Sequence, residues 1–313
     1  MRSERETPCS FWYGPPVSTS ILLTGATGFI GRRVLPKLQQ AGFAVRCATR
    51  DVAAAKKRSP ELEWVHLDLG DRATIGAALA GCSAALYLVH AMAEGEGYEA
   101  RERDSARAFA EESAAQHLER IVYLGGVVPR GAMSHHLHSR MITGEILRGG
   151  TVPVFELRAT MVVGHGSISW KIVRDLAVRL PAMILPRWMS SRSQPIAIDD
   201  VTFALVRALT LPLEHAGVHD LPGPEILTAK EILLRIAHLR GTRPLMISVP
   251  FLTPRLSSYW LKLVTGADYR VARELVDGLA SDLVATQPEL WRLVEHTRLS
   301  FDEAARLALA DEG

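Results

Sequence analysis

A group of glycines near the start of the chain is the first feature whose spacing could do chemistry. Gly25, Gly28 and Gly31 follow a short apolar stretch that ends at Thr24. In such a pattern the first glycine permits a tight turn, the second lets a phosphate approach the backbone, and the third lets a helix pack closely on a strand. The N-terminus of that helix attracts a pyrophosphate. Although a merely tight strand-to-helix connection is the alternative, we predict a dinucleotide site formed by Gly25, Ala26, Thr27, Gly28, Phe29, Ile30 and Gly31.

The end of the second apolar stretch indicates which dinucleotide binds. NAD-binding folds usually place a carboxylate there for the ribose hydroxyls, whereas this sequence has Thr49 and Arg50. A guanidinium can pair with a 2′-phosphate through two hydrogen bonds, and the basic residues 56–58 add positive charge. We therefore predict NADP(H) in preference to NAD(H), which stays possible. In the alternative interpretation Arg50 is solvated and Asp51 binds the ribose.

Short apolar stretches alternate with amphipathic ones from Ser20 onward, which predicts a parallel sheet covered by helices on both faces, a doubly wound Rossmann-type α/β fold. The predicted strands are 20–24, 44–49, 64–68, 84–90, 120–124 and 154–158, and the predicted helices are 28–40, 73–80, 99–116 and 142–148. We expect a flexible leader (1–18), an NAD(P)-binding domain (19–163) and a smaller, mainly helical substrate lobe (164–313), with some segments of the lobe returning to the sheet.

The composition argues against several classes of protein. Lys and Arg number 36 against 34 Asp and Glu and are scattered, so no nucleic-acid partner is expected. No apolar run approaches the roughly 20 residues that cross a bilayer. The cysteines, Cys9, Cys47 and Cys82, lie far apart and favour a reducing, cytoplasmic setting. The sequence leaves the oligomeric state open.

Further motifs follow the glycine turn in a fixed order. They are Tyr87-Leu88-Val89-His90, Tyr123-Leu124-Gly125-Gly126, Glu156-Leu157-Arg158-Ala159 and Pro195-Ile196-Ala197-Ile198-Asp199-Asp200-Val201. With this ordered set, the chain from about Thr19 to its C-terminus resembles the extended or atypical short-chain dehydrogenases/reductases (SDRs). Within them it is similar to the bacterial branch that includes the NADPH-binding accessory subunit of complex I and NmrA-like proteins.

The resemblance implies positions for the cofactor. Asp68 and Leu69 would flank the adenine, and Leu88, Val89 and His90 would line the cofactor cleft. Gly126 would join them at the end of the fifth strand, and Thr160 and Met161 would lie near the nicotinamide. Two alternatives stay open: Asp68 as a carboxylate that caps the next turn, and His90 as a hydrogen-bonded, partly buried imidazole.

The usual catalytic residues of this superfamily are replaced. Ordinary members use a Tyr with a Lys four residues later, because the ammonium lowers the pKa of the phenol, and a Ser or Thr after the fifth strand orients the substrate oxygen. Here Gly125 and Gly126 stand where that hydroxyl is expected, and His136 and Arg140 have the Tyr and Lys spacing.

His136 and Arg140 would share one helical face, which predicts an imidazole proton donor beside a guanidinium that holds phosphate or ribose. Arg140 cannot shuttle protons, and its charge would lower the pKa of His136. The alternative is that Ser134, His135, His136 and His138 form a polar surface loop entering a helix, with no catalytic part. No metal site is expected, because neither a Cys nor a carboxylate pair completes a ligand set.

Two stretches of the second lobe carry open interpretations. One could form a cleft for a planar or anionic ligand, or could simply pack the lobes together, and it contains Trp170, Pro186, Arg187, Trp188, Arg192 and Gln194. For residues 250–264 we favour a lid or core helix over a membrane-surface helix, so peripheral membrane contact is not expected.

These patterns favour an NADPH-dependent oxidoreductase acting on a small organic carbonyl, imine or activated double bond. The hydride would come from the cofactor, and the proton would come from His136, His135 or water. A non-catalytic NADP(H)-binding redox regulator or structural subunit is the main alternative, because the Ser-Tyr-Lys set is absent. A sugar-nucleotide epimerase or dehydratase ranks lower, since those enzymes normally depend on the Tyr and Lys. The substrate, the pathway and the direction of reaction stay open.

Overall fold

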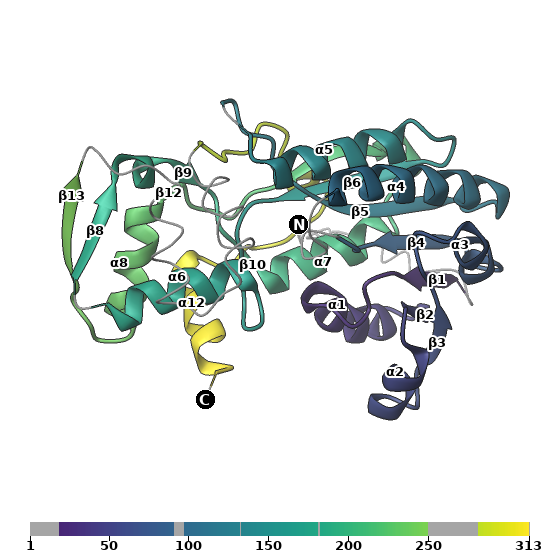
Figure 1. The fold of residues 1–313 in the computed structure, drawn as a ribbon, viewed down its shortest axis with the longest axis horizontal. Helices are drawn as coiled ribbons and strands as arrows, with labels where there is room; N and C mark the ends of the chain where they lie inside the picture. The colour runs from purple at the N-terminus through teal and green to yellow at the C-terminus, as the bar shows by residue number, and fades with distance from the viewer. Residues whose placement is uncertain (1–18, 91–96, 132, 181, 250–280, 313) are drawn as a thin grey trace, which may run out of the picture.

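The computed structural model describes residues 19–90, 97–131, 133–180, 182–249 and 281–312. The predicted leader, Cys9 and the predicted lid helix at 250–264 lie outside these residues. The centre of the fold is a parallel sheet of seven strands in the order β11-β6-β5-β4-β1-β2-β3 (Figure 1). The strands are β1 (Ser20–Leu23), β2 (Ala44–Thr49), β3 (Glu63–His66), β4 (Ala84–Tyr87), β5 (Arg120–Gly126), β6 (Val154–Ala159) and β11 (Gly217–Leu221).

Alternating side chains of the buried strands supply two cores, one on each face of the sheet. Ile21 and Leu23 of β1 face one side, where they pack with α1 and α7, and Leu22 faces the other, where it packs with α3, α4 and α5. The helices around the sheet are α1 (Phe29–Gln40), α2 (Val52–Arg58), α3 (Arg72–Leu79), α4 (Tyr98–Ala115), α5 (His135–Arg148), α7 (Ile198–Ala208) and α11 (Leu290–Leu293). The predicted doubly wound Rossmann-type fold is confirmed.

Several predicted boundaries were wrong for identifiable reasons. β4 ends at Tyr87 rather than at residue 90, and β3 ends at His66 rather than at residue 68. α5 begins at His135, not at residue 142, because the Ser134 hydroxyl accepts a hydrogen bond from the Leu137 N–H and caps it. Its early turns bury small and polar residues, so apolar periodicity does not reveal them.

Two elements near the sheet were not predicted at all. α2 is capped by the Asp51 carboxylate, which accepts the Ala54 N–H at 2.8 Å. β11 forms the edge of the sheet beside β6. It contains His219 and Asp220, so it lacks the apolar run that marks the other strands. Through α7 and β11, part of the sequence after residue 163 lies in the sheet layers.

The rest of that sequence builds a smaller, mainly helical lobe on the left of Figure 1. Its core joins α6 (Ile168–Arg179), α8 (Ala229–Leu239) and α12 (Phe301–Ala310). Short strand pairs and 3-10 turns complete the lobe and its connections: β7 (Val162–Val163) with β10 (Ile196–Ala197), β8 (Ala182–Pro186) with β13 (Leu245–Val249), β9 (Arg192–Ser193) with β12 (Leu227–Thr228), and the turns Arg187–Ser190 and Leu213–His215.

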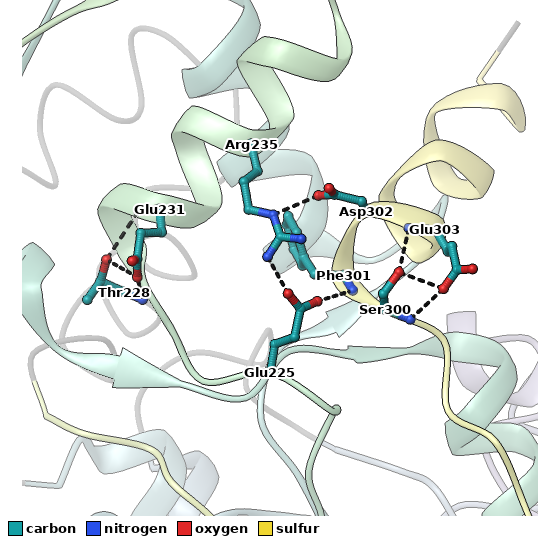
Figure 2. A network of polar contacts seen from close by, with 8 residues as sticks. All are labelled: Glu225, Thr228, Glu231, Arg235, Ser300, Phe301, Asp302 and Glu303. Carbon is teal, nitrogen blue, oxygen red and sulfur yellow. Dashed lines mark hydrogen bonds and ion pairs between the residues drawn. The ribbon is translucent and has the colours of Figure 1, made fainter.

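Polar contacts fix α12 against α8 (Figure 2). Arg235 of α8 donates to Asp302 at 2.7 Å and to Glu225 at 2.6 Å, and its guanidinium lies over the Phe301 ring. The second oxygen of Glu225 accepts the Phe301 N–H at 2.7 Å. Both helices begin with a reciprocal capping box, formed by Thr228 with Glu231 and by Ser300 with Glu303. The last helix is therefore an anchored part of the lobe.

Candidate functional site

The glycine turn connects β1 to α1 in a geometry that few other residues could adopt. Gly25 has a φ of +64°, in the left-handed region. A Cβ on Gly31 would lie 2.2 Å from the Gly25 carbonyl oxygen and 2.8 Å from the Ala26 Cα, which are both backbone atoms. The helix can therefore approach the strand this closely only with glycine at position 31.

The start of α1 lacks a side-chain cap and has no acidic residue in its first turn. By contrast, side chains cap the N-termini of α2, α3, α5 and α6, through Asp51, Asp71, Ser134 and Ser167. An uncapped helix start leaves backbone N–H groups for a ligand, and the positive end of the helix dipole favours an anion. The turn therefore fits the pyrophosphate of a dinucleotide.

Arg50 and Asp68 lie at the same carboxyl edge of the parallel sheet as the glycine turn, because each follows a strand that runs the same way. Arg50 is exposed, and its carbonyl oxygen lies 3.1 Å from His66 Nδ1. The Asp68 carboxylate accepts the Gly70 N–H at 3.0 Å, which is the turn-capping contact considered from the sequence, and Leu69 is half-buried beside it.

A cavity of about 270 Å³ lies where the carboxyl ends of β5 and β6 meet α1, α5 and α6. It brings together part of the predicted site: Phe29, Ile30, Gly126, His136, Arg140, Thr160 and Met161. Most of the remaining lining is apolar and comes from Leu124, Val127, Leu137, Ala159, Val162, Ile172, Val173 and Leu283. The lining does not include Arg50, Asp68, Leu69, Leu88, Val89 or His90, so the adenine-end residues and the loop after β4 stand apart from it.

Phe29 and Thr160 connect this cavity to the second lobe. Cβ atoms on Gly164 and Gly166 would lie 3.2 Å and 3.3 Å from the Phe29 ring, so the ring is held close to that connecting loop. The Thr160 hydroxyl donates to the Gln194 carbonyl oxygen at 2.6 Å. The cavity wall is thus made by both parts of the molecule.

Behind the cavity lies a buried polar group that sequence reasoning missed in part. His90 Nδ1 lies 2.6 Å from one oxygen of Glu102, and the Ser139 hydroxyl donates to the other. Glu102 is 8% exposed and therefore joins α4, the loop after β4 and α5. The His90 ring packs 4.5 Å from the ring of His136, which lines the cavity. Glu102 and Ser139 belong to helices and follow no motif, so only the folded chain reveals their contact.

Burial controls the ionisation of both imidazoles. It lowers the pKa of His90, against the effect of the Glu102 hydrogen bond, and Arg140 lowers the pKa further. Burial also holds the pKa of His136 well below its ordinary value, with His90 and Arg140 adding to the shift. His136 is therefore neutral near pH 7 and is a poor source of protons.

The entry into a helix considered for residues 134–138 lies at Ser134, which caps α5, and the helix covers His135 to His138. His136 lies half-buried against the cavity, whereas His135 is exposed and pairs with Glu99 at 3.0 Å. Helix periodicity explains this difference between neighbouring imidazoles.

Arg140 lies over the end of β5. One of its terminal nitrogens, Nη2, donates to the Leu124 carbonyl oxygen, and its own carbonyl accepts the Tyr123 hydroxyl at 3.0 Å. A Cβ on Gly126 would lie 2.9 Å from Leu137 Cδ2 and 3.8 Å from Arg140 Cδ. The missing side chain at Gly126 therefore makes room for two residues of α5.

Three of the residues predicted near a second cleft, Trp170, Arg192 and Gln194, hold parts of the lobe together. Trp170 is 1% exposed in the lobe core. Arg192 pairs with Asp282 at 2.7 Å, and the Gln194 side chain accepts the Ala285 N–H at 2.8 Å. None of the three lines the cavity.

Comparison with known proteins defines the class. Residues 25–175 match the family described as NAD(P)H-binding. The chain is 28% identical over 239 residues to ceramide reductase of Caulobacter vibrioides, covering 74% of this chain and 73% of that protein. It is also 28% identical over 233 residues to (4-alkanoyl-5-oxo-2,5-dihydrofuran-3-yl)methyl phosphate reductase of Streptomyces griseus, covering 72% and 75%.

The fold is shared with the triphenylmethane reductase of Citrobacter sp. in its complex with NADP(H), with a TM-score of 0.73, 16% identity and coverage of 92% of this chain and 99% of that one. Residues 25–175 form an NAD(P)H-binding domain of the reductase-like type. This match agrees with the resemblance to the atypical short-chain dehydrogenases/reductases on which the cofactor positions were predicted.

The described ranges contain neither a membrane-spanning helix nor a cluster of metal ligands. No helix there combines the length and apolar character needed to span a membrane. No group of three or more His, Cys, Asp or Glu side chains in that part of the chain is arranged to hold a metal ion.

Proposed function

We propose that this protein is an NADPH-dependent reductase of a small, largely apolar organic substrate with a carbonyl, imine or activated double bond. The observation that carries the proposal is the cavity that runs from Phe29 and Ile30, at the start of α1, to His136 and Arg140 on α5. A site for the reducing end of a dinucleotide and a site for an organic acceptor would share that space.

The residues present fit the cofactor. The glycine turn and the uncapped start of α1 would hold the pyrophosphate. Phe29 and Ile30 of the same turn also line the cavity, so a dinucleotide held there would reach it. When bound, NADPH would supply the hydride.

The choice of NADP(H) over NAD(H) is supported by Arg50, which stands where many NAD-binding folds offer a carboxylate. The nearby Asp51 already caps α2 with one carboxylate oxygen, which counts against its binding a ribose. The Citrobacter relative in fold has been solved with NADP(H).

The mainly apolar lining favours a substrate with few hydroxyl groups, which counts against a sugar nucleotide. Because His136 is neutral near pH 7, the proton that completes the reduction would come from water. The residues of α5 would then position the substrate rather than protonate it.

A second candidate function is binding of NADP(H) without turnover, as in a redox-responsive regulator or a structural subunit. The specific observation in its favour is that no tyrosine is among the residues that line the cavity, while the one imidazole there has a strongly lowered pKa. In that case the cofactor would stabilise one state of the protein for a partner.

The test measures whether the protein binds NADPH and whether it also oxidises NADPH in the presence of a substrate. The purified protein is titrated with NADPH by tryptophan fluorescence and then mixed with quinones, enones and aldehydes, while NADPH oxidation is followed by absorbance. Deuterium at C4 of NADPH should appear on a carbon of the product, and Gly31→Val should abolish both binding and turnover. Saturable binding with no oxidation across the panel would support the non-catalytic candidate, and no binding at all would reject both.

A further inference from the structure

Arg140 presents a cation to the cavity without a carboxylate partner. Among the described residues it forms no ion pair, and the lining of the cavity contains no Asp or Glu. Its Nε–H is buried and has no hydrogen-bond acceptor, although Nη2 donates to the Leu124 carbonyl oxygen. Leaving a buried donor unsatisfied costs about 1–3 kcal/mol and more for a charged group, so an anionic ligand bound in the cavity beside the guanidinium would offset part of that cost.

We propose that Arg140 is a catalytic residue that binds and stabilises the negatively charged oxygen formed on the substrate during reduction. This inference rests on the proposed reductase function and sharpens it. It narrows the substrate class to carbonyl compounds, enones and quinones, in which the electrons of the reaction come to rest on an oxygen. An imine, whose electrons come to rest on nitrogen, fits the site less well.

The local backbone supports this role. Ordinary members of the superfamily place a hydroxyl after the fifth strand to hold the substrate oxygen. A side chain at Gly126 would press on Leu137 at 2.9 Å and lie close to the Arg140 arm. A hydroxyl side chain at position 126 would therefore require Leu137 to shift, and this chain instead places the Arg140 side chain beside Gly126.

The chemistry needs no acid on the protein. Hydride addition forms a C–H bond at the electrophilic carbon and breaks the C–O or C–C π bond, whose electron pair moves to the oxygen as an alkoxide or enolate. The substrate gains two electrons, NADPH becomes NADP⁺, and water later protonates the product. A guanidinium stays charged throughout such a reaction, so it stabilises the anion without giving up a proton. A preformed donor of this kind acts on charge that develops in the transition state.

Two other roles for Arg140 make different predictions. If it only held the end of β5 through the Leu124 carbonyl oxygen, its removal would destabilise the fold and lower the affinity for all ligands alike. If it bound a phosphate or ribose of the cofactor, its removal would lower the affinity of the protein for NADPH. An oxyanion role concerns the substrate oxygen alone.

The test compares Arg140→Met, Arg140→Lys and the exposed control Arg107→Met. The first readout is equilibrium binding of cinnamate and cinnamamide, which have similar shapes but differ in charge at the oxygen, to the protein saturated with NADP⁺. We expect Arg140→Met to lose about tenfold or more in affinity for cinnamate, the value of a charge-assisted hydrogen bond, and to bind cinnamamide as before. Arg140→Lys should keep part of the preference and Arg107→Met all of it.

The second readout separates this inference from the proposed function. With an active carbonyl or enone substrate, Arg140→Met should lower kcat by about 100-fold, as loss of one oxyanion donor does, and leave the Kd for NADPH within about twofold. If the wild-type protein never oxidises NADPH yet prefers cinnamate through Arg140, the reductase proposal fails and the anion site stands. Equal losses for cinnamate and cinnamamide, or weakened NADPH binding, would overturn the inference. If Arg140→Met does not fold, absence of cinnamate preference in the wild type overturns it as well.

Discussion

The two ends of the cavity are built by opposite means. At the α1 end, where Phe29 and Ile30 of the glycine turn line the cavity, the site depends on side chains that are missing, since a Cβ on Gly31 would lie 2.2 Å from a backbone oxygen and α1 begins without a cap. At the end formed by α5, it depends on crowded side chains from several elements, with Glu102 and His90 behind His136 and with Leu137 against Gly126. The first end is specified by local backbone geometry and the second by tertiary packing.

The largest effect is expected where the backbone sets the site. Gly31→Ala should lower the free energy of unfolding by about 3 kcal/mol, because backbone atoms cannot move aside, and should weaken NADPH by about 100-fold. Thermal unfolding and fluorescence titration measure the two effects. Gly81→Ala is the control: Gly81 has a positive φ, of +74°, but nothing lies near its Cβ position. It should lose about 1 kcal/mol and bind NADPH normally. Equal behaviour of the two variants would show that close packing at Gly31 is unimportant.

At the α5 end, removal of the carboxylate that His90 and Ser139 share should destabilise the protein most. Glu102→Leu leaves the His90 Nδ1–H and the Ser139 hydroxyl without their acceptor, so we expect a loss of about 2–3 kcal/mol in urea unfolding. The control is Glu111→Leu on the same helix, whose exposed pair with Arg72 should contribute less than about 1 kcal/mol. A loss no larger than that of the control would mean that the buried carboxylate does not hold the three segments together.

Arg50 tests whether any side chain matters at the cofactor end. Arg50→Ala should weaken NADPH by about tenfold, the value of a charge-assisted contact to a 2′-phosphate, and leave NADH unchanged. Binding titrations of both cofactors to the wild type, Arg50→Ala and the exposed control Arg103→Ala measure the difference. If NADPH and NADH bind the wild type equally, the assignment of the 2′-phosphate to Arg50 is wrong.

The smallest expected effect concerns pH. The native pKa of His136 is held well below its ordinary value of 6.5, so below pH 6.5 the unfolded chain takes up a proton that the native protein refuses. The contribution of the neutral His136 to the free energy of unfolding should therefore be fully present above pH 6.5 and fall as the pH decreases. The change is at most about 1.4 kcal/mol per pH unit for one group.

His136→Gln should reduce that fall by about 1 kcal/mol between pH 7.5 and 5.5, as measured by urea unfolding at each pH. His138→Gln, exposed on the same helix, provides the comparison. His90, whose pKa is also lowered, remains in both variants, so its contribution cancels. Identical pH dependence in the wild type and His136→Gln would place the titration elsewhere.

The contrast between local backbone geometry and tertiary packing also explains what the sequence could predict. The fold class and the glycine turn follow from short-range patterns, namely apolar periodicity and the spacing of Gly25, Gly28 and Gly31. β11 escaped prediction because an edge strand with His219 and Asp220 lacks that periodicity. α5 was cut short because its first turns bury Ser139 and Thr143 rather than large apolar residues.

At the site, spacing was enough to place His136 and Arg140 on one helix face, and both line the cavity. Their surroundings could not be predicted. Glu102 approaches His90 from a helix whose own pattern gives it no distinction from the other acidic residues of α4. The strong lowering of the His136 pKa depends on burial, which is a property of the packed chain and not of a motif.

The anchoring of α12 has a consequence for the order in which the molecule is made. A ribosome delivers the strands β1 to β6 and the glycine turn by residue 159, whereas Phe301, Ala304 and Ala305, which complete the core behind α6, emerge later. Chains fold as they are synthesised, with N-terminal units first. The nascent protein can therefore form its nucleotide-binding end while the opposite wall of the cavity, with Ile172 and Val173, still lacks its support.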